Sequence, residues 1–463
     1  MNIEAFADLK QWATQQWGAV KLGDKRRTQR AVQMGAALAA NPSASLPEQM
    51  QSWGSLKAAY RLLSEADVSH AALSEPHWEQ TPSSAKTSDA GVVLFVQDTS
   101  ELDYRGQTQT QDLGHIGDSR GRGLMLHSCL AVIPTLGNAE IIGLAGQRVW
   151  RRTALKTGTE TRTQRASRHR ESEIWAEMVE TIGGAPECGQ RWVSVGDRGS
   201  DVFSYLRRAK ALNWQCLFRA CQDRVIVNAE GSKGRLMQSA RALSAMAQTT
   251  LALRGRDGQP KQTLELQVSW FPVQIVPPQH GAERHEAPQS GWCLRVWQAT
   301  PAAEAKALEW VLFTTIAITD ATEALVQVEW YATRWTIEEY HKCLKTGCGI
   351  EHRQLTTADG LERLLGFLAI VALRLLQLRT LARTDPTLPA QKIVPARMLQ
   401  VLVARLHLPQ SSLTLAEFWH ALARLGGFIG RRSDGNPGWQ TLWRGWFRLQ
   451  DLCWGALLAL EPR

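Results

Sequence analysis

The stretch YATRWTIEEYHKCLK, from Tyr331 to Lys345, reads as a helix because it is rich in helix formers and contains neither glycine nor proline. Consecutive residues of an α-helix are separated by about 100°. At that spacing, five side chains fall within an arc of roughly 80°: Tyr331, Arg334, Glu338, Lys342 and Lys345. A face packed on a core would be apolar. This face is therefore either a solvated, salt-bridged surface or a site that combines a carboxylate, an aromatic ring and three cations.

The composition limits the classes of protein to which the chain can belong. Its 463 residues exceed one ordinary domain and predict two or three domains with real cores. A hydrophobic share of 44% and a charged share of 21% are typical of a soluble globular protein and exclude a disordered one. The net charge of +9 favours a polyanionic partner, either nucleic acid or an anionic membrane surface. The 19 tryptophans can serve as core residues or as stacking platforms.

No segment of the sequence is typical of a membrane protein. The N-terminus carries acids and no apolar run, so it is not a secretory signal. The longest apolar run, Leu364 to Leu373, is too short to span a bilayer. The 8 cysteines include no CxxC pair, and we expect a reduced, cytoplasmic protein. An irregular cluster leaves a zinc site open: His341, Cys343, Cys348 and His352.

Two predicted strands each deliver an aspartate at their C-terminal end. The apolar run GVVLFVQ, Gly91 to Gln97, is typical of a buried strand and leads into Asp98. RWVSVGD, Arg191 to Asp197, is a second short strand that ends in an acid. Ligand sites of mixed sheets covered by helices form at the C-terminal ends of strands. Each aspartate is therefore either a site residue or an ordinary turn or cap residue.

The remaining segments predict helical ends around a middle part rich in strands. The basic segment Arg148 to Arg170 carries eight cations against the single acid Glu160, which predicts a loop close to an anion, and its role stays open. The other expected elements are a helical region over 1–70, strands over 124–133, 140–146 and 214–219, a helix over 171–180, a β-rich insertion over about 222–325, an apolar helix over 361–379 and a helical, tryptophan-containing region over 380–463.

The two predicted strands and the predicted helix carry three acids that are candidates for a metal site: Asp98, Asp197 and Glu338. Converging carboxylates repel one another, which raises their pKa values unless a divalent cation lies among them. Hard oxygen ligands select Mg²⁺ or Mn²⁺. Two such ions about 4 Å apart can clamp the attacking and leaving oxygens of an in-line phosphoryl displacement. In a basic protein, this chemistry points to a nucleic-acid phosphodiester as substrate.

The sequence resembles the bacterial cut-and-paste DDE transposases, specifically the insertion-sequence group typified by the Tn-five transposase. Tyr331, Arg334, Glu338 and Lys345 match the Y-x2-R-x3-E-x6-K signature of that group. QDTS around Asp98 and GDRGSD around Asp197 match as well, as do LGDKRRTQR near the N-terminus, GLERLLGFLAIVALRLLQLR after the signature and ARLGGF near the C-terminus. The likeness therefore covers most of the chain.

This resemblance implies an α/β fold: a ribonuclease H-like catalytic domain (71–379), with a mixed sheet, flanking helices and the β-rich insertion, between a helical DNA-binding domain (1–70) and a helical dimerisation domain (380–463). It implies that Asp98, Asp197 and Glu338 hold two Mg²⁺ or Mn²⁺ ions. It also implies a set of DNA contacts: Tyr331, Arg334, Lys342 and Lys345 near the scissile phosphate, Trp310 under a flipped base, Arg219 on the backbone, and Arg26, Arg27 and Arg30 on the terminal repeat. For Trp310, a place in the strand core is the alternative.

The implied activity is cut-and-paste transposition of double-stranded DNA by a homodimer that joins two transposon ends in a synaptic complex, associated with the nucleoid when bound. End nicking, hairpin formation, hairpin opening and strand transfer into target DNA would follow at one metal site. Two rivals stay open. One is a nuclease of the same fold without strand transfer, and the other is a domesticated DNA-binding protein, which the intact acid triad disfavours.

Overall fold

The computed structural model describes residues 8–118, 120–135, 138–153, 170–253, 262–299, 307–409, 413–431 and 434–458. Within these ranges the strands form one twelve-stranded mixed sheet. The strands are β1 (Val92–Asp103), β2 (Gly114–Ile116), β3 (Gly121–Thr135), β4 (Asn138–Trp150), β5 (Arg191–Gly196), β6 (Gln215–Arg219), β7 (Val225–Val227), β8 (Lys233–Arg235), β9 (Ala247–Leu253), β10 (Gln262–Ile275), β11 (Gln289–Gln298) and β12 (Glu309–Thr314).

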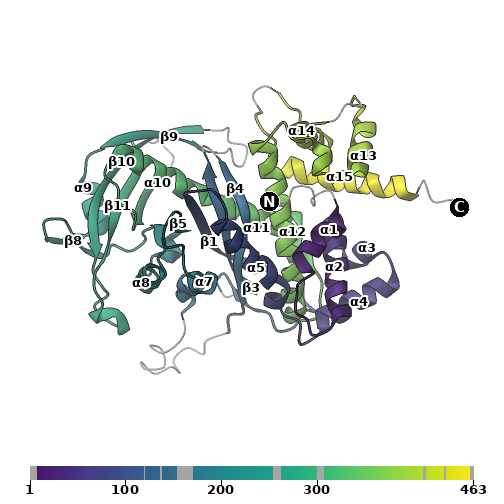
Figure 1. Ribbon diagram of the computed structural model, residues 1–463, viewed down its shortest axis with the longest axis horizontal. Helices are drawn as coiled ribbons and strands as arrows, with labels where there is room; N and C mark the ends of the chain where they lie inside the picture. The colour runs from purple at the N-terminus through teal and green to yellow at the C-terminus, as the bar shows by residue number, and fades with distance from the viewer. Residues whose placement is uncertain are drawn as a thin grey trace.

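The helices gather on both faces of this sheet and at one of its ends (Figure 1). They are α1 (Leu9–Trp17), α2 (Lys25–Ala40), α3 (Leu46–Met50), α4 (Trp53–Ser64), α5 (His70–Lys86), α7 (Ile174–Ile182), α8 (Phe203–Ala211), α9 (Leu236–Ala242), α10 (Ala321–Thr333), α11 (Trp335–Lys342), α12 (Ala358–Thr384), α13 (Ala396–Leu406), α14 (Leu415–Leu425) and α15 (Trp439–Leu458).

The order of the strands confirms the predicted fold class. β4, β3 and β1 pair antiparallel, and β1, β5 and β6 pair parallel, as in a ribonuclease H-like sheet. The strands predicted for the β-rich insertion are also present. They continue the same sheet, because β12 pairs antiparallel with β6 and leads through β11 to β10. The insertion and the catalytic strands are therefore parts of one hydrogen-bonded sheet.

Strand β1 shows how the sheet separates two cores. Its even-numbered residues Leu94 and Val96 lie in the larger core, which α11 and α12 cover, whereas Val93 and Phe95 lie in the core beneath α7 and α8. This division follows from the pleat of a strand, which directs successive side chains to opposite faces. All four side chains are buried completely. A side chain two residues beyond Val96 is therefore expected on the face of α11.

Helix α12 is the centre of the larger core. It is the one helix in the described ranges that is long and apolar enough to cross a membrane, but 89% of its most apolar window is buried inside the protein. β4 and α5 pack on it, as do helices from both ends of the chain. Its length and burial identify α12 as a core helix.

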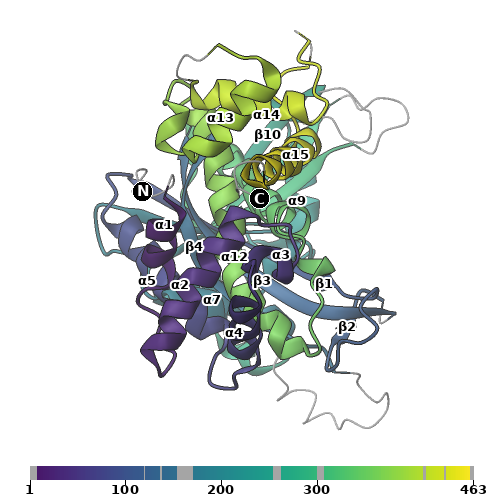
Figure 2. The ribbon, with the colours of Figure 1, turned by 90° about the vertical axis from the view of Figure 1, so that its right-hand side faces the viewer.

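The N-terminal helices α1–α4 and the C-terminal helices α13–α15 lie next to each other at one end of the sheet, and both groups pack on α12 (Figures 1 and 2). Trp17, Phe367 and Trp443 belong to a single contiguous apolar cluster that also contains the inner face of the sheet. The domain boundaries at residues 70 and 379 remain predictions. The apolar core is continuous across both positions.

Two predicted elements differ from the structure. β1 does not end at Asp98 but continues to Asp103, because β3 remains its partner after β5 has ended. The helix predicted from Tyr331 to Lys345 is interrupted at Arg334, whose N–H bonds to the carbonyl of Tyr331 in a tighter turn, and its last part is a π-helix, Cys343–Gly347. A wider turn rotates the side chains that follow, so the predicted single face ends before Lys345.

Candidate active site

Asp98 and Asp197 lie side by side on the sheet. The parallel pairing of β1 with β5 places Val96 opposite Val195, and both aspartates come two residues later. Val96 and Val195 both face the core beneath α11 and α12. Since side chains two residues apart share a face, both aspartates are directed to this side of the sheet. The predicted meeting of two strand-end acids is therefore present.

Glu338 reaches the same place from α11, which packs on β1. The pKa of Asp98 is raised to about 7, first because the side chain is buried and next because of the negative charge of Asp197, with a further contribution from Glu338. The positive charge of Arg334 opposes this rise. The three acids thus interact electrostatically, as carboxylates at one site do.

Asp197 is held in place by its own backbone environment. It caps the short helical turn Arg198–Ser200, where its Oδ1 accepts a 2.7 Å hydrogen bond from the N–H of Gly199. Asp197 is thus a cap residue, as the alternative interpretation of the sequence proposed. The cap also fixes the direction of the carboxylate, which is compatible with a role at the site.

The guanidinium of Arg334 is a positive charge close to Asp98 and Glu338. Its Nη2 lies 2.6 Å from Glu338 Oε1, and only 13% of its side chain is exposed. Among the described residues, no three His, Cys, Asp or Glu side chains converge closely enough to enclose a metal ion. The donor set nevertheless fits a hard divalent cation, because it consists of three carboxylates, and burial together with the negative charges of two of them raises the pKa of the third, Asp98.

The same finding applies to the cluster considered for zinc. His341, Cys343, Cys348 and His352 all lie in the described ranges and do not form a metal-binding group there. Cys343 and Cys348 are buried in the core instead. His341 points toward the acids, with Nδ1 3.8 Å from Asp98 Oδ2, and burial lowers its pKa to about 3. The sequence analysis considered His341 only as a possible zinc ligand and did not predict its place beside the acids.

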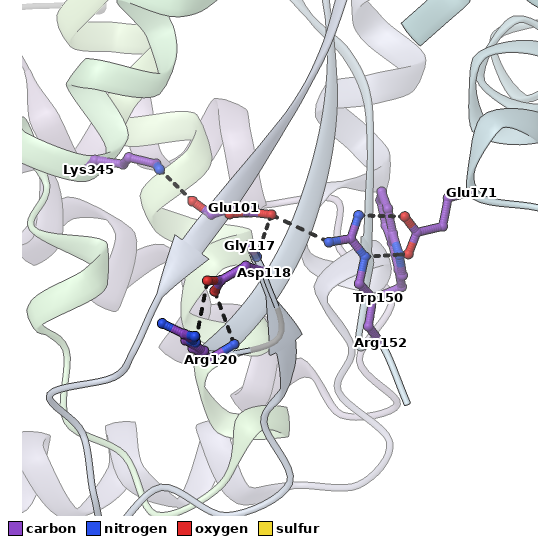
Figure 3. Close-up of polar contacts among 8 residues, drawn as sticks. All are labelled: Glu101, Gly117, Asp118, Arg120, Trp150, Arg152, Glu171 and Lys345. Atoms are coloured by element: carbon purple, nitrogen blue, oxygen red, sulfur yellow. Dashed lines mark hydrogen bonds and ion pairs between the residues drawn. The ribbon is translucent and has the colours of Figure 1, made fainter. Parts of the chain in front are cut away.

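Lys345 does not share the position of Arg334. Its ammonium bonds to the main-chain carbonyl of Glu101 on β1 and lies 3.2 Å from the Glu351 carboxylate. Figure 3 shows Glu101 as a junction: its side chain accepts from the N–H of Gly117 at 2.9 Å and contacts Arg152 at 3.4 Å. Lys345 is thus fixed at the far end of β1.

Arg219 is the second cation at the site. It donates a 2.7 Å hydrogen bond to the carbonyl of Glu309. Burial lowers its pKa, and the nearby positive charge of Arg198 lowers it further. Arg198 directly follows Asp197 and is exposed, and the sequence analysis did not single it out. Its position beside a strand-end acid was the available signal. Lys342 is exposed on α11.

Trp310 and Tyr331 pack against each other in the core. Their ring centroids lie 5.0 Å apart in an edge-to-face arrangement, and the ring of Trp335 also meets that of Trp310 edge to face, with centroids 6.0 Å apart. Only 5% of Trp310 is exposed. This packing is that of the core alternative, and a stacking role for Trp310 remains a prediction that requires its neighbours to move.

The three predicted repeat-reading arginines differ in their surroundings. Arg26 is 89% exposed and pairs with Asp24, and Arg30 is half-buried on α2. Arg27 instead pairs with Glu65 at 2.7 Å and Asp67 at 3.6 Å. Most of the basic segment, residues 154–169, lies outside the described residues, whereas Arg151 and Arg152 form ion pairs with acids of the protein.

Comparison with known proteins gives three family matches along the chain. Residues 9–68 match a transposase DNA-binding model, residues 152–374 a transposase DDE domain model and residues 370–460 a Tn5 transposase dimerisation domain model. The DDE match includes Asp197 and Glu338, and Asp98 precedes it. Together the matches cover each part of the fold except the segment that carries α5 and β1 to β4.

Among solved structures, the chain is similar to a cryo-EM structure of a piggyBac transposase synaptic complex with hairpin DNA. The likeness has 9% sequence identity and a TM-score of 0.32, and it covers 66% of this chain and 50% of that chain. The match therefore spans only half of that transposase, and it is too weak to carry an argument about this protein.

Proposed function

Because the chain belongs to the Tn5-type DDE transposases, we propose that it cuts a mobile DNA element from its donor site and joins it to target DNA. Enzymes of the DDE type cleave DNA and transfer strands, and they depend on divalent metal. The observation that carries the proposal is the parallel register that sets Asp98 beside Asp197 beneath Glu338. The substrates would be the inverted repeats at the element's ends and the target duplex.

The cofactor of this reaction would be Mg²⁺ or Mn²⁺, with two ions for each active site. Asp98, Asp197 and Glu338 would hold them through carboxylate oxygens, which such hard cations prefer. When bound, the ions would stabilise the charge on the attacking and leaving oxygens of a phosphoryl displacement. Binding would require Glu338 to exchange its ion pair with Arg334 for metal, which would release the Arg334 guanidinium toward DNA.

The reaction would comprise four displacements at phosphorus. Water first attacks at the end of the element, breaks the bond to the bridging 3′ oxygen and leaves a 3′-OH. This hydroxyl would then attack a phosphate of the opposite strand, forming a hairpin and displacing the 3′ oxygen of the flanking donor DNA. Water would open the hairpin at that phosphate and restore the 3′-OH. The same 3′-OH would finally attack a phosphate of the target and displace the 3′ oxygen of the target strand. Arg334, Arg219 and Lys342 would hold the phosphates close to the acids, because guanidinium and ammonium groups neutralise DNA backbone charge.

The chain would act as a homodimer in a synaptic complex, with its C-terminal helices contributing to the dimer contact. The match of residues 370–460 to a dimerisation domain supports this assembly. Each subunit would cut the end that its partner holds. Mixing an acid-triad variant with a variant that cannot bind ends tests this arrangement, because cleavage by the mixture requires catalysis across the dimer.

The central experiment compares Glu338→Gln with Glu329→Gln, an exposed acid of the preceding helix. We expect Glu338→Gln to bind end DNA with normal affinity, to bind Mn²⁺ more weakly by titration calorimetry and to leave the DNA uncut. Glu329→Gln should match the wild type in all three measurements. Cleavage by Glu338→Gln at the wild-type rate would refute the assigned site. Joined products on a gel separate a transposase from a nuclease of the same fold.

A further inference from the structure

Helix α11 carries Glu338, but it is short and irregular at both ends. A tight turn at Arg334 separates it from α10, and the π-helix Cys343–Gly347 follows it after eight residues. The rotation of α11 about its own axis is therefore not inherited from a longer regular helix. The direction in which Glu338 points depends on the side chains that hold α11 to its neighbours.

One of these side chains is the next residue along the chain. Glu339 is turned by about 100° from Glu338 on the helix and meets α12. Its Oε2 accepts a hydrogen bond from Arg379 Nη1 at 2.6 Å, and only 14% and 5% of the two side chains are exposed. Such a buried ion pair is costly to break, because either partner alone would be an uncompensated charge. This pair therefore holds one side of α11 to α12.

The first turns of α15 complete this contact. The guanidinium carbon of Arg379 lies 4.1 Å from the centre of the Trp439 ring, in a cation–π arrangement. Trp443, one turn further along α15, stacks on Trp439 with ring centroids 4.8 Å apart and planes inclined by 9°. Trp443 also packs on Gly347 at the end of the π-helix, where a Cβ would lie 2.5 Å from the indole. α15 thus contacts both the partner of Glu339 and the segment that follows α11.

The same helix belongs to the region that matches a transposase dimerisation domain, residues 370–460. Trp443 and Trp446 are buried in the core of the chain, whereas Gln440 and Arg444 are exposed. α15 therefore has one side on its own catalytic domain and another side that is open to a second copy.

The lengths involved show why these contacts matter for catalysis. A carboxylate on α11 lies roughly 5–6 Å from the helix axis, so a rotation of the helix by about 15° moves it by roughly 1.5 Å. A misplacement of about 1 Å at a catalytic group can cost about a hundredfold in rate. The contacts at Glu339 and Gly347 resist such a rotation, and they do so at a distance from the metal site itself.

We infer that Glu339, Arg379 and Trp439 are positioning residues for Glu338, through which α15 sets the geometry of the metal site in its own chain. This inference rests on the proposed function. It gives the dimerisation region a second task, because besides joining two copies it would hold the catalytic helix in its working orientation. The three residues act through α11 and need not touch metal or DNA.

The test uses full-length Trp439→Leu, which removes the ring over Arg379 and keeps the ion pair with Glu339. We expect normal affinity for a duplex of the inverted repeat that brackets the reading frame, and an unchanged dimer. The affinity for Mn²⁺ should fall by at least about threefold and single-turnover cleavage should slow by about tenfold. Trp439→Phe keeps an aromatic face for the guanidinium and should recover most of the loss. Trp292→Leu, which removes a half-buried indole from β11, is the matched control and should behave as the wild type.

The outcomes separate this inference from the proposed function. Wild-type cleavage and Mn²⁺ affinity in Trp439→Leu would refute the positioning role while the proposed function stands. Slower cleavage with normal Mn²⁺ affinity would refute it too, because the loss would then not arise at the metal site. Wild-type protein that neither binds Mn²⁺ nor cuts the repeat overturns both. If Trp439→Leu melts at a lower temperature than the wild type, Arg379→Lys takes its place, since it keeps the charge beside Glu339 but not the planar group on the indole.

Discussion

We expect Asp98→Asn to stabilise the metal-free protein above neutral pH while it abolishes cleavage. Burial, together with the charges of Asp197 and Glu338, raises the pKa of Asp98 to about 7 in the folded protein. In an unfolded chain an aspartate titrates near 3.9. A carboxyl group whose pKa rises on folding binds more protons in the folded than in the unfolded state. The stability of the wild type therefore falls as the pH rises from about 4 to 7.

The magnitude follows from the difference between the two pKa values. About three pKa units correspond to about 4 kcal/mol of unfolding free energy once the pH exceeds 7. Asparagine removes the charge and keeps the volume, but its amide also loses hydration when it is buried. We therefore expect a gain of about 2 kcal/mol at pH 8 and no gain below pH 4.

The assay is urea unfolding in EDTA at a series of pH values, with the exposed Asp89→Asn as the isosteric control. The gap between Asp98→Asn and the wild type should open as the pH rises toward 7 and should be absent for the control. Added Mn²⁺ should narrow or reverse the gap, because the wild type gains binding energy that the variant lacks. A gap that does not change with pH would show that Asp98 does not carry the predicted electrostatic cost.

Three further changes test other parts of the structure. Trp310→Ala should slow hairpin formation more than the first nick in a gel assay with end DNA, and equal slowing of both steps would leave Trp310 as a core residue only. Arg353→Met should lower the unfolding free energy by about 2–4 kcal/mol in urea, because Arg353 bonds to the carbonyls of Pro42, Ala44 and Cys348; an unchanged midpoint would contradict this. Gly445→Ala should weaken the dimer in analytical ultracentrifugation, because its added Cβ would lie 1.8 Å from a carbonyl oxygen of α14. The control is Gly455→Ala, whose Cβ would meet nothing within 4 Å and which should behave as the wild type.

The elements of this fold that could be predicted are those whose signal is local. Apolar runs indicated β1 and β5, and the acids after them were found because a strand end is visible in the sequence. The register that brings Asp98 beside Asp197 is a contact between strands about a hundred residues apart, and no local pattern contains it. The continuation of the catalytic sheet into the insertion through β12 and β6 escaped prediction for the same reason.

The side-chain partners of the cations were the least predictable part of the site. The wheel of an ideal helix placed Lys345 with Arg334, but the π-helix from Cys343 to Gly347 changes the rotation. Lys345 then meets Glu101, which lies 244 positions away in the chain. The family resemblance implies a contact of Arg27 with the terminal repeat, which stays a prediction, but nothing in the sequence indicated its ion pairs with residues about forty positions later. A cation's partners depend on tertiary contacts, which residue spacing alone does not describe.

The apolar core that joins both ends of the chain to the sheet restricts how such an enzyme can be retargeted. Grafting a foreign DNA-binding domain in place of α1–α4 would uncover the side chains of α12 that Trp17 and its neighbours bury. The exposed apolar side chains of α12 would lower the solubility of the fusion and impair its folding, whatever sequence the new domain recognised. Exchanging residues on the solvent side of α4 leaves that core intact. In the region that matches a transposase DNA-binding model, a library of substitutions at such exposed positions is therefore a more conservative starting point for new end specificity than a domain fusion.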